Sequence, residues 1–165
     1  MSAFNYKDFE ETLIEILGEI TQETVIIANQ NAPRPLMPYF TAQLLSFNSL
    51  GETEELLSQT ETVEVRSWGE LTIQIKAVGM ESFERALDCK SKFRLRQYGD
   101  RLFVHGAGMG TVGNVIDAPI IRQNGFELQS IFDVTFNIAS VEDEELGYIE
   151  TAEIAGTINQ RPITV

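Results

Sequence analysis

The sequence predicts an α+β fold: a mostly antiparallel, long-stranded, curved sheet with helices packed on one face. Two observations predict the sheet, because residues 126–139 and 62–78 both alternate apolar with polar side chains, the period of a half-buried strand. A third predicts the helices, because apolar residues in 6–21 and 82–95 recur at helical spacing. The first stretch would reach about 45 Å at ~3.3 Å per residue, so it needs a long partner, and we expect it to pair with or neighbour 62–78 at the centre of the sheet.

Length and charge bound the class of protein. The chain has 165 residues, 43% of them hydrophobic, which predicts one packed domain, residues 1–158, followed by a C-terminal tail, 159–165. The formal net charge is −13, with 25 acidic and 12 basic residues. Gripping a phosphate backbone needs clustered Lys and Arg, so the charge argues against a DNA-gripping protein. Acidity suits solubility, and it equally suits a surface past which DNA slides without sticking.

The compartment follows from three further features of the sequence. Cys89 is the only cysteine, which rules out an internal disulfide and fits a reducing environment. The N-terminus lacks the basic and apolar segments of a secretory signal. No apolar run approaches the roughly 20 residues that span a bilayer. We therefore expect the protein to fold in a cytoplasm.

The first predicted helix covers residues 6–21 and is capped by Asn5 or Ser2. It carries one apolar stripe toward a core: Phe9, Leu13, Ile16, Leu17 and Ile20. Residues 24–28 predict a short buried strand. Three prolines in 33–38 make the next segment a stiff loop, which either presents Arg34 or Met37 to a partner or simply turns a corner.

The middle of the chain predicts a strand at 39–49, an acidic loop or hairpin tip at 51–61, and the long strand 62–78. Gly69 in that strand predicts a bulge or bend. Trp68, the only tryptophan, lies on the polar face beside the bend. There it either anchors an interface or packs under a helix.

The second predicted helix covers residues 82–95, with Ser82 as its cap. Its end is basic, as the helix dipole favours: Lys90, Lys92, Arg94 and Arg96. Residues 100–105 predict another short helix or strand.

The segment GAGMGTVGN, residues 106–114, formally contains G-x-G-x-x-G in Gly108, Gly110 and Gly113. Dinucleotide binding needs a strand before this motif, a helix after it and a βαβ unit around it. Pro119 and the short remaining chain argue against that arrangement. We expect a flexible loop with several glycines at positive φ.

No catalytic constellation is visible in the sequence. His105 and Cys89 are single residues, without the spacing of a zinc site or a Cys-His pair. The acidic run 142–145 lacks the alternating ligands and turn glycine of a calcium loop, so we interpret it as a charged hairpin loop before a last strand, 148–158. The sequence predicts no enzyme, no metal and no cofactor.

Three blocks of the sequence resemble one family. They are VIIANQNAPRPLMPYFTAQLLSF, residues 25–47; RSWGELTIQIKAVG, residues 66–79; and GYIETAEIAG, residues 147–156. Their order and spacing resemble the tailed-bacteriophage neck or tail-terminator family over nearly all of the chain. The most specific block is the NQN-PRP-xxPY loop after a short strand.

The resemblance implies a structural virion protein of the tail and neck, assembled in the host bacterial cytoplasm. Such proteins form a homohexameric ring that caps the last ring of the tail tube, stops tail polymerisation and joins the tail to the head connector. The implied partners are further copies of the chain, the tail tube protein, a sheath where one is present, and head connector or adaptor proteins. DNA would pass through the lumen without specific binding, and no membrane is involved. The family implies no catalytic residues.

Two other functions stay open: another tail-completion protein or baseplate adaptor, and a nucleotide-binding domain built on the glycine segment. Interface residues are expected among exposed side chains that the core does not need: Arg34, Met37, Trp68, Glu52, Glu54, Asp143 and Glu144. One end of strand 126–139 should pack on a neighbouring subunit. An acidic lumen would repel exiting DNA.

Overall fold

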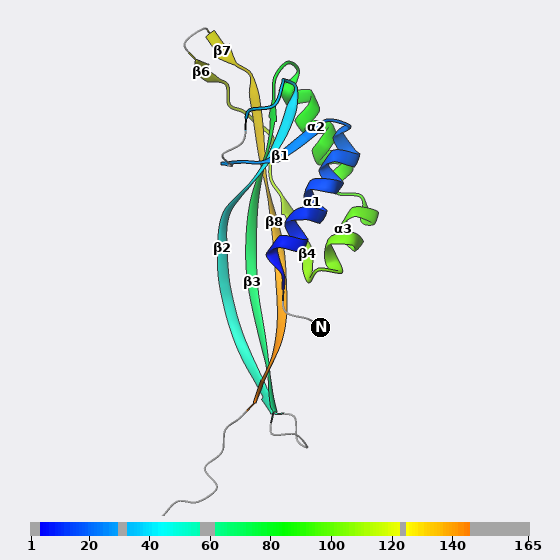
Figure 1. Ribbon diagram of the computed structural model, residues 1–165, viewed down its shortest axis with the longest axis vertical. Helices are drawn as coiled ribbons and strands as arrows, with labels where there is room; N and C mark the ends of the chain where they lie inside the picture. Colours follow the sequence, from blue (N-terminus) through cyan, green and yellow to red (C-terminus); the bar gives the residue numbers. More distant parts are fainter. Residues whose placement is uncertain (1–3, 30–32, 57–61, 123–124, 146–165) are drawn as a thin grey trace, which may run out of the picture.

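The computed structural model of the protein describes residues 4–29, 33–56, 62–122 and 125–145. Within them the fold is α+β, with helices on one side of a mostly antiparallel open sheet, which confirms the predicted class (Figure 1). The helices are α1 (Tyr6–Thr21), α2 (Ser82–Phe93) and α3 (Arg96–Phe103). The strands are β1 (Thr24–Ile27), β2 (Tyr39–Leu56), β3 (Thr62–Val78), β4 (Ala107–Val112), β5 (Ile116–Asp117), β6 (Ile120–Arg122), β7 (Gly125–Glu127) and β8 (Gln129–Glu145).

The main sheet has the strand order β1-β2-β3-β8-β4, and β5 also pairs with β8. β1 runs parallel to β2, and the other pairings in this sheet are antiparallel. β6 and β7 form a separate two-stranded sheet. The two longest stretches of alternating sequence thus lie side by side at the centre, as predicted.

The β3–β8 pair carries the core. Its register runs from Thr62 opposite Glu145 to Val78 opposite Gln129 without a shift. The buried side of the pair is apolar: Leu71, Ile73, Ile75, Phe132, Val134 and Phe136. Burying side chains of this size contributes roughly 1.5–3 kcal/mol each, so this face dominates the stability of the fold.

Helix α1 packs its predicted stripe against that face. Phe9, Leu13, Ile16, Leu17 and Ile20 are all buried. Asn5 is the cap, since its side-chain oxygen accepts from the Lys7 N–H at 3.0 Å. The Phe9 ring meets the Phe136 ring edge-on, with centroids 5.1 Å apart, which fixes the helix over β8.

Both ends of the predicted strand 126–139 are corrected. At its start, Phe126 and Leu128 are exposed and β8 begins only at Gln129. The reason is that residues 125–127 pair with β6 and the Leu128 carbonyl accepts from the Gly79 N–H at 2.9 Å, outside the ladder. At its far end, β8 runs on to Glu145, so the predicted hairpin loop at 142–145 is wrong.

Strand β2 is also longer than predicted. Residues 51–56 continue the ladder with β3, so the acidic tip does not begin at 51. Two register shifts insert Leu45 and Leu50 as extra residues, so the bulge expected at Gly69 lies in the opposite strand. Gly69 serves a different purpose, because a Cβ there would lie 2.5 Å from the Phe47 Cζ. The ring of Phe47 occupies the space that the glycine leaves.

The second predicted helix ends early and is capped differently. Glu81, in the left-handed conformation, is the N-cap of α2, so the prediction of a Ser82 cap is wrong. Ser82 is instead buried, with its Oγ 3.1 Å from the Ser130 Oγ. A short break after Phe93 leads into α3, which contains most of the element expected at 100–105.

The glycine segment is a strand and not a flexible loop. Residues 107–112 form β4 at the edge of the sheet, and only Gly106 in this segment has a positive φ, +79°. The glycines allow β4 to approach β8 closely: a Cβ on Gly110 would lie 2.9 Å from the Thr135 carbonyl oxygen. No helix follows within the described residues, which removes the phosphate-cradle geometry of the dinucleotide motif.

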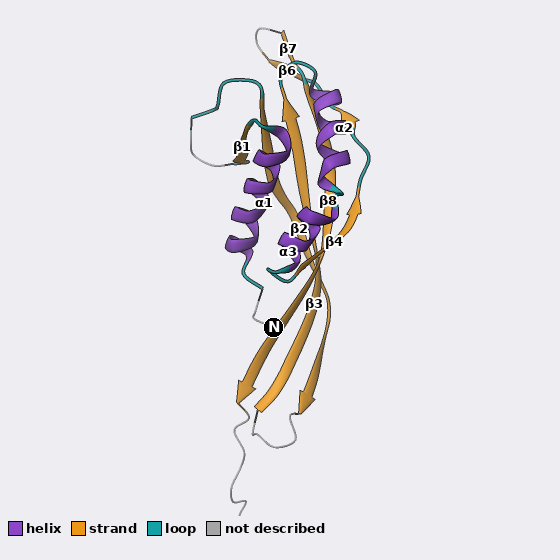
Figure 2. Cartoon of the chain, turned by 90° about the vertical axis from the view of Figure 1, so that its right-hand side faces the viewer, coloured by secondary structure: helices purple, strands orange, loops and turns teal. Residues whose placement is uncertain are grey.

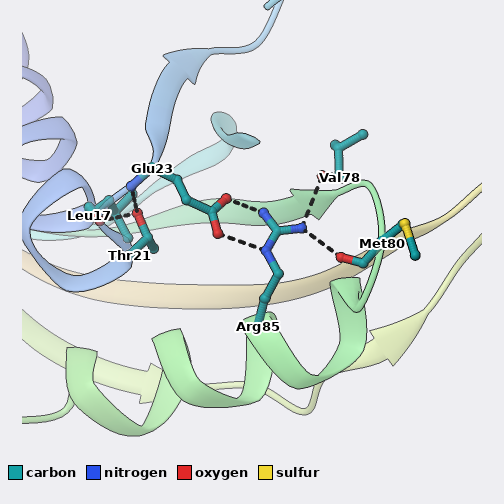
Figure 3. Close-up of polar contacts among 6 residues, drawn as sticks. All are labelled: Leu17, Thr21, Glu23, Val78, Met80 and Arg85. Carbon is teal, nitrogen blue, oxygen red and sulfur yellow. Dashed lines mark hydrogen bonds and ion pairs between the residues drawn. The ribbon is translucent and has the colours of Figure 1, made fainter. Parts of the chain in front are cut away.

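Arg85 ties three parts of the fold together (Figure 3). Its guanidinium pairs with both carboxylate oxygens of Glu23, at the turn between α1 and β1. It also donates to the Val78 and Met80 carbonyls at 3.1 and 3.2 Å, at the turn between β3 and α2. The same group lies 5.1 Å from the centroid of the Phe40 ring in β2. Helix α2 is therefore fixed in place by polar contacts as well as by its apolar side.

The predicted last strand at 148–158 and the tail at 159–165 lie outside the described residues. The division into one domain and a tail remains a prediction.

Candidate assembly surfaces

Three strands continue beyond the helical layer and form an arm (Figures 1 and 2). We define the arm as residues 51–56 of β2, 62–68 of β3 and 139–145 of β8. The helical layer ends where the Phe4 N–H donates to the Ser140 Oγ at 3.1 Å. Because none of the described helices covers the arm, it contributes little to the core formed by the described residues.

The sheet has open edges on both sides of the arm. β1 pairs with β2 only at Tyr39–Ala42, so among the described residues the edge of β2 from Gln43 onward has no strand partner. β4 pairs with β8 only up to Ile138, and the Ala139 N–H donates to the Gly106 carbonyl at 3.1 Å. From Ser140 onward this edge of β8 has no strand partner within the same described part of the chain. An open edge offers backbone N–H and carbonyl groups to another strand.

The arm is strongly acidic. Its carboxylates in the described strands are Glu52, Glu54, Glu55, Glu64, Glu142, Asp143, Glu144 and Glu145, and Arg66 is the one cation there. Arg66 pairs with Glu64. Glu55, Glu64 and Asp143 stand at directly paired positions across the three strands. Like charges at such positions destabilise a sheet, so the repulsion between these carboxylates opposes the pairing of the three arm strands.

Trp68 lies at the base of the arm on the face away from the helices. It is 41% exposed and paired with Gly51 and Ala139, two small residues. A hollow of about 380 Å³ lies beside it, lined by Glu64, Arg66, Trp68, Ala139, Ser140 and Val141. The alternative of packing under a helix does not apply, because the helices lie on the other face.

The opposite end of the molecule is organised around Glu127. This carboxylate is only 6% exposed, although it lies in a short strand of the hairpin β6–β7. Arg34 contacts it at 2.5 Å and Arg122 at 3.5 Å. The hydrogen bond from Arg34, together with the two positive charges, lowers the pKa of Glu127 below its ordinary value. The proline loop is thereby tied to the hairpin.

Arg34 has further contacts in the monomer. Its Nε donates to the Tyr39 hydroxyl at 2.6 Å, and its guanidinium lies 5.5 Å from the Tyr39 ring centroid. The sequence did not reveal these intramolecular contacts of Arg34, because its partners are scattered along the chain. An interface role for Arg34 stays a prediction.

Exposed apolar side chains gather near this end on the proline loop, the β3–α2 turn and the hairpin. They are Leu36, Met37, Met80, Ile121, Phe126 and Leu128. A hollow of about 300 Å³ is lined by four of them: Met37, Met80, Phe126 and Leu128. Sequence reasoning missed the hairpin residues because Phe126 was assigned to the buried face of a longer strand.

The predicted interface residues divide into two groups at opposite ends. Arg34 and Met37 lie on the proline loop. Glu52 and Trp68 lie on the arm, where both are exposed. Glu54, Asp143 and Glu144 occupy strand positions in the arm, but their side chains lie outside the described part of the structure. No single surface brings all seven together.

Cys89 and His105, the two side chains with catalytic potential, are both engaged in structural contacts of the fold. Cys89 lies on the buried side of α2, and burial raises the pKa of its thiol to about 12. The His105 Nε2 lies 3.0 Å from the Thr12 Oγ1. Within the described ranges, no three His, Cys, Asp or Glu side chains gather in a way that could hold a metal ion. None of the helices described is long and apolar enough to cross a membrane.

Comparison with known protein families gives a match over residues 11–161 to the phage neck terminator proteins. The match covers most of the chain, including the proline loop, both central strands and the arm. The chain belongs to the phage neck terminator family. No curated protein matches it. Membership confirms the resemblance seen in the sequence and assigns the chain a structural role at the neck of a phage virion, among other head and tail proteins.

Proposed function

We propose that this neck protein forms a closed homohexameric ring that caps the tail tube and joins it to the head connector. The observation that carries the proposal is the arm: three paired strands that have, among the described residues, open edges, an exposed tryptophan and no helical cover. A monomer gains little stability from such an extension, whereas a ring can use it as contact surface. Head-to-tail contacts between identical copies close into a ring when the rotation between neighbours divides a full turn.

The two chemically different ends support the second half of the proposal. The acidic arm lies at one end, and the apolar surface around Met37 and Phe126 lies at the other. A ring built from such copies has two unlike rims. Unlike rims suit a part that contacts a tail tube on one side and a head connector on the other.

The proposal includes an acidic lumen through which DNA passes without specific binding. The net charge of −13 and the clustering of carboxylates on the arm support it. Like-charge repulsion would keep DNA from adhering to the wall. A ring structure with a neutral or basic inner wall would contradict this part.

The test is assembly of the purified chain, alone and with tails lacking it. Negative-stain images should show sixfold rings, and mass measurement should give six copies. Added protein should label the head-proximal end of the tails and make them competent to join heads. A chain that stays monomeric and never binds tails contradicts the ring. Labelling of the distal end would instead indicate a baseplate adaptor.

A further inference from the structure

One flank of α2 presents two apolar and two cationic side chains outward. Phe83, Leu87 and Lys90 of α2 and its C-cap residue Arg94 are spaced i, i+4, i+7 and i+11, so they lie along one line of the helix and its cap. The core-facing residues Ala86, Cys89 and Phe93 occupy a different line and are buried. We call the outward line the α2 stripe. At ~1.5 Å per residue it is roughly 16 Å long.

Among the described residues the α2 stripe has no ion-pair partner and is partly exposed. Phe83 and Leu87 are both about two-fifths exposed, at 39% and 42%. Within the described residues Lys90 and Arg94 form no ion pair, whereas the neighbouring cations do: Lys92 with Asp88, Arg96 with Asp100, and Arg101 with Glu15 and Glu19. In a chain with so few basic residues, two free cations beside two exposed apolar side chains form a surface suited to an acidic, partly apolar partner.

The arm has the matching chemistry. Val65 lies in its central strand, paired with Glu142 on one side, and Ser67 is paired with Glu52. Alternation places Val65 and Ser67 on the same face of β3 as the core residue Leu71, which is the helix side of the sheet. Glu52 and Glu142 are exposed. This face of the arm therefore sets a valine between carboxylates.

The contact cannot form within one chain. Helix α2 packs over the far end of the sheet, where Ser82 meets Ser130, while the arm extends in the opposite direction (Figures 1 and 2). Any meeting of the two surfaces must join two copies. Because the surfaces differ, the contact is head-to-tail, the type that a closed ring requires.

We propose that the α2 stripe is the docking surface for the arm of a second copy of this chain. Lys90 and Arg94 face carboxylates of the neighbour's arm, among them Glu52 and Glu142, and Phe83 and Leu87 cover its apolar seam around Val65. Docking relieves the repulsion among carboxylates that the arm carries alone. The inference rests on the proposed ring and names the two surfaces that build it.

A charge-swap experiment tests the inference. We compare wild type, K90E/R94E, E52K/E142K and the quadruple variant by negative-stain imaging and by the protein concentration at which half of the chains are in rings. Each double variant places like charges across the contact, so that concentration should rise at least about tenfold. The quadruple variant restores opposite charges and should recover most of the loss. K7E/K92E is the matched control, because it makes the same charge change on α1 and on the other side of α2 and should leave assembly unchanged.

The outcomes distinguish a failure of the contact between stripe and arm from a failure of the proposed ring. Thermal unfolding of every variant, followed by circular dichroism, establishes that the folds are intact. If folded double variants assemble like wild type, or if the quadruple variant fails to recover, the pairing of stripe and arm is wrong while the ring itself stands. If wild type forms no ring alone or on tails, the proposed function and this inference both fall.

Discussion

At the scale of single residues, Glu127 shows how a short hairpin is held to the body. The carboxylate is almost fully buried, and Arg34 and Arg122 approach it from the proline loop and from β6. Removing one partner of such a group leaves the other incompletely paired, which costs more than the pair gains over solvent. Since Arg34 is 42% exposed, solvent screening reduces the effect.

We expect Glu127→Gln to lower the free energy of unfolding by about 1–2 kcal/mol at pH 7, measured by urea unfolding of the monomer. The folded-state pKa of Glu127 is lowered, so its pairing stabilises the fold above the ordinary carboxyl pKa and is lost as the pH falls through the lowered value. The difference from wild type should therefore shrink below about pH 4. Glu142→Gln, at an exposed position, should stay within about 0.5 kcal/mol of wild type. A difference for Glu127→Gln that grows on acidification would contradict the assigned pairing.

Two glycines of β4 should respond in opposite directions to the same change. A Cβ on Gly110 would lie 2.8 Å from the Thr135 Oγ1 and 2.9 Å from its carbonyl oxygen, so Gly110→Ala forces the edge strand away and should cost about 1–2 kcal/mol. At Gly108 the nearest atom is the Asn137 carbonyl oxygen at 3.6 Å, so Gly108→Ala should be neutral or stabilising by up to about 1 kcal/mol. Chemical denaturation of both variants checks the pair. Equal destabilisation would show that the close approach of β4 to β8 is not what requires glycine.

At the scale of elements, the helical layer is held to the sheet by contacts between phenylalanine side chains and by the guanidinium of Arg85. The Phe136 ring contacts Phe9 of α1 and Phe93 of α2, with centroids 5.1 and 6.4 Å away. Arg85 adds directional contacts that place α2 along the sheet, because its planar fork reaches a carboxylate and two carbonyls at once. This positioning decides where the α2 stripe faces.

Arg85→Ala should therefore lower the free energy of unfolding by about 2–3 kcal/mol, because it removes the hydrogen-bond donor of the Glu23 carboxylate and of two turn carbonyls. Arg85→Lys keeps the charge but offers one donor group, so it should recover less than half of that loss. Thermal and urea unfolding measure both. Arg94→Ala, at the C-cap of the same helix and without an ion pair among the described residues, is the control and should change stability by no more than about 0.5 kcal/mol. Full rescue by lysine would show that only the charge matters.

At the scale of the whole molecule, the buried core and the proposed assembly surface lie at different positions along the long axis. The buried residues lie where helices cover the sheet, and the arm carries charge, open edges and Trp68. Changes in the arm should therefore leave the monomer folded while altering the ring. Such a division allows a neck protein to fold before it meets its partners.

Trp68→Ala should change monomer stability by less than about 1 kcal/mol, because the side chain is 41% exposed on the uncovered face. If Trp68 anchors the contact between copies, the half-assembly concentration should rise by at least about tenfold. As the only tryptophan, it also reports assembly directly: its emission should shift to shorter wavelength as rings form. Leu36→Ala, an exposed apolar change at the other end, should leave ring formation unchanged. Emission that does not change on assembly would remove Trp68 from the contact.

The sequence by itself determined the parts of the fold that local periodicity controls. The stripe of α1, the pairing of 62–78 with the later long strand and the apolar face of both follow from spacings of two and of about 3.6 residues. These patterns record which side of an element meets the core, so they predict burial well. They also sufficed for the family, because the proline loop and the W-G-E strand lie in the matched region.

Only the tertiary structure decided which polar and glycine-rich stretches are strands. Residues 51–56 and 142–145 were predicted to lie in acidic loops, and 107–112 in a glycine loop, because glutamate and glycine have low strand propensity. Each becomes a strand because a paired strand supplies backbone hydrogen bonds: 51–56 pairs with 63–68 in a hairpin, 142–145 with 62–65, and 107–112 with 134–138. The pairing of Arg34 with Glu127 likewise joins two segments that are far apart in the chain. Contacts between separate segments leave no local period, so the arm emerged only in three dimensions. The spacing of the α2 stripe is local, but the packing of α2 on the sheet decided which line of the helix stays outside the core.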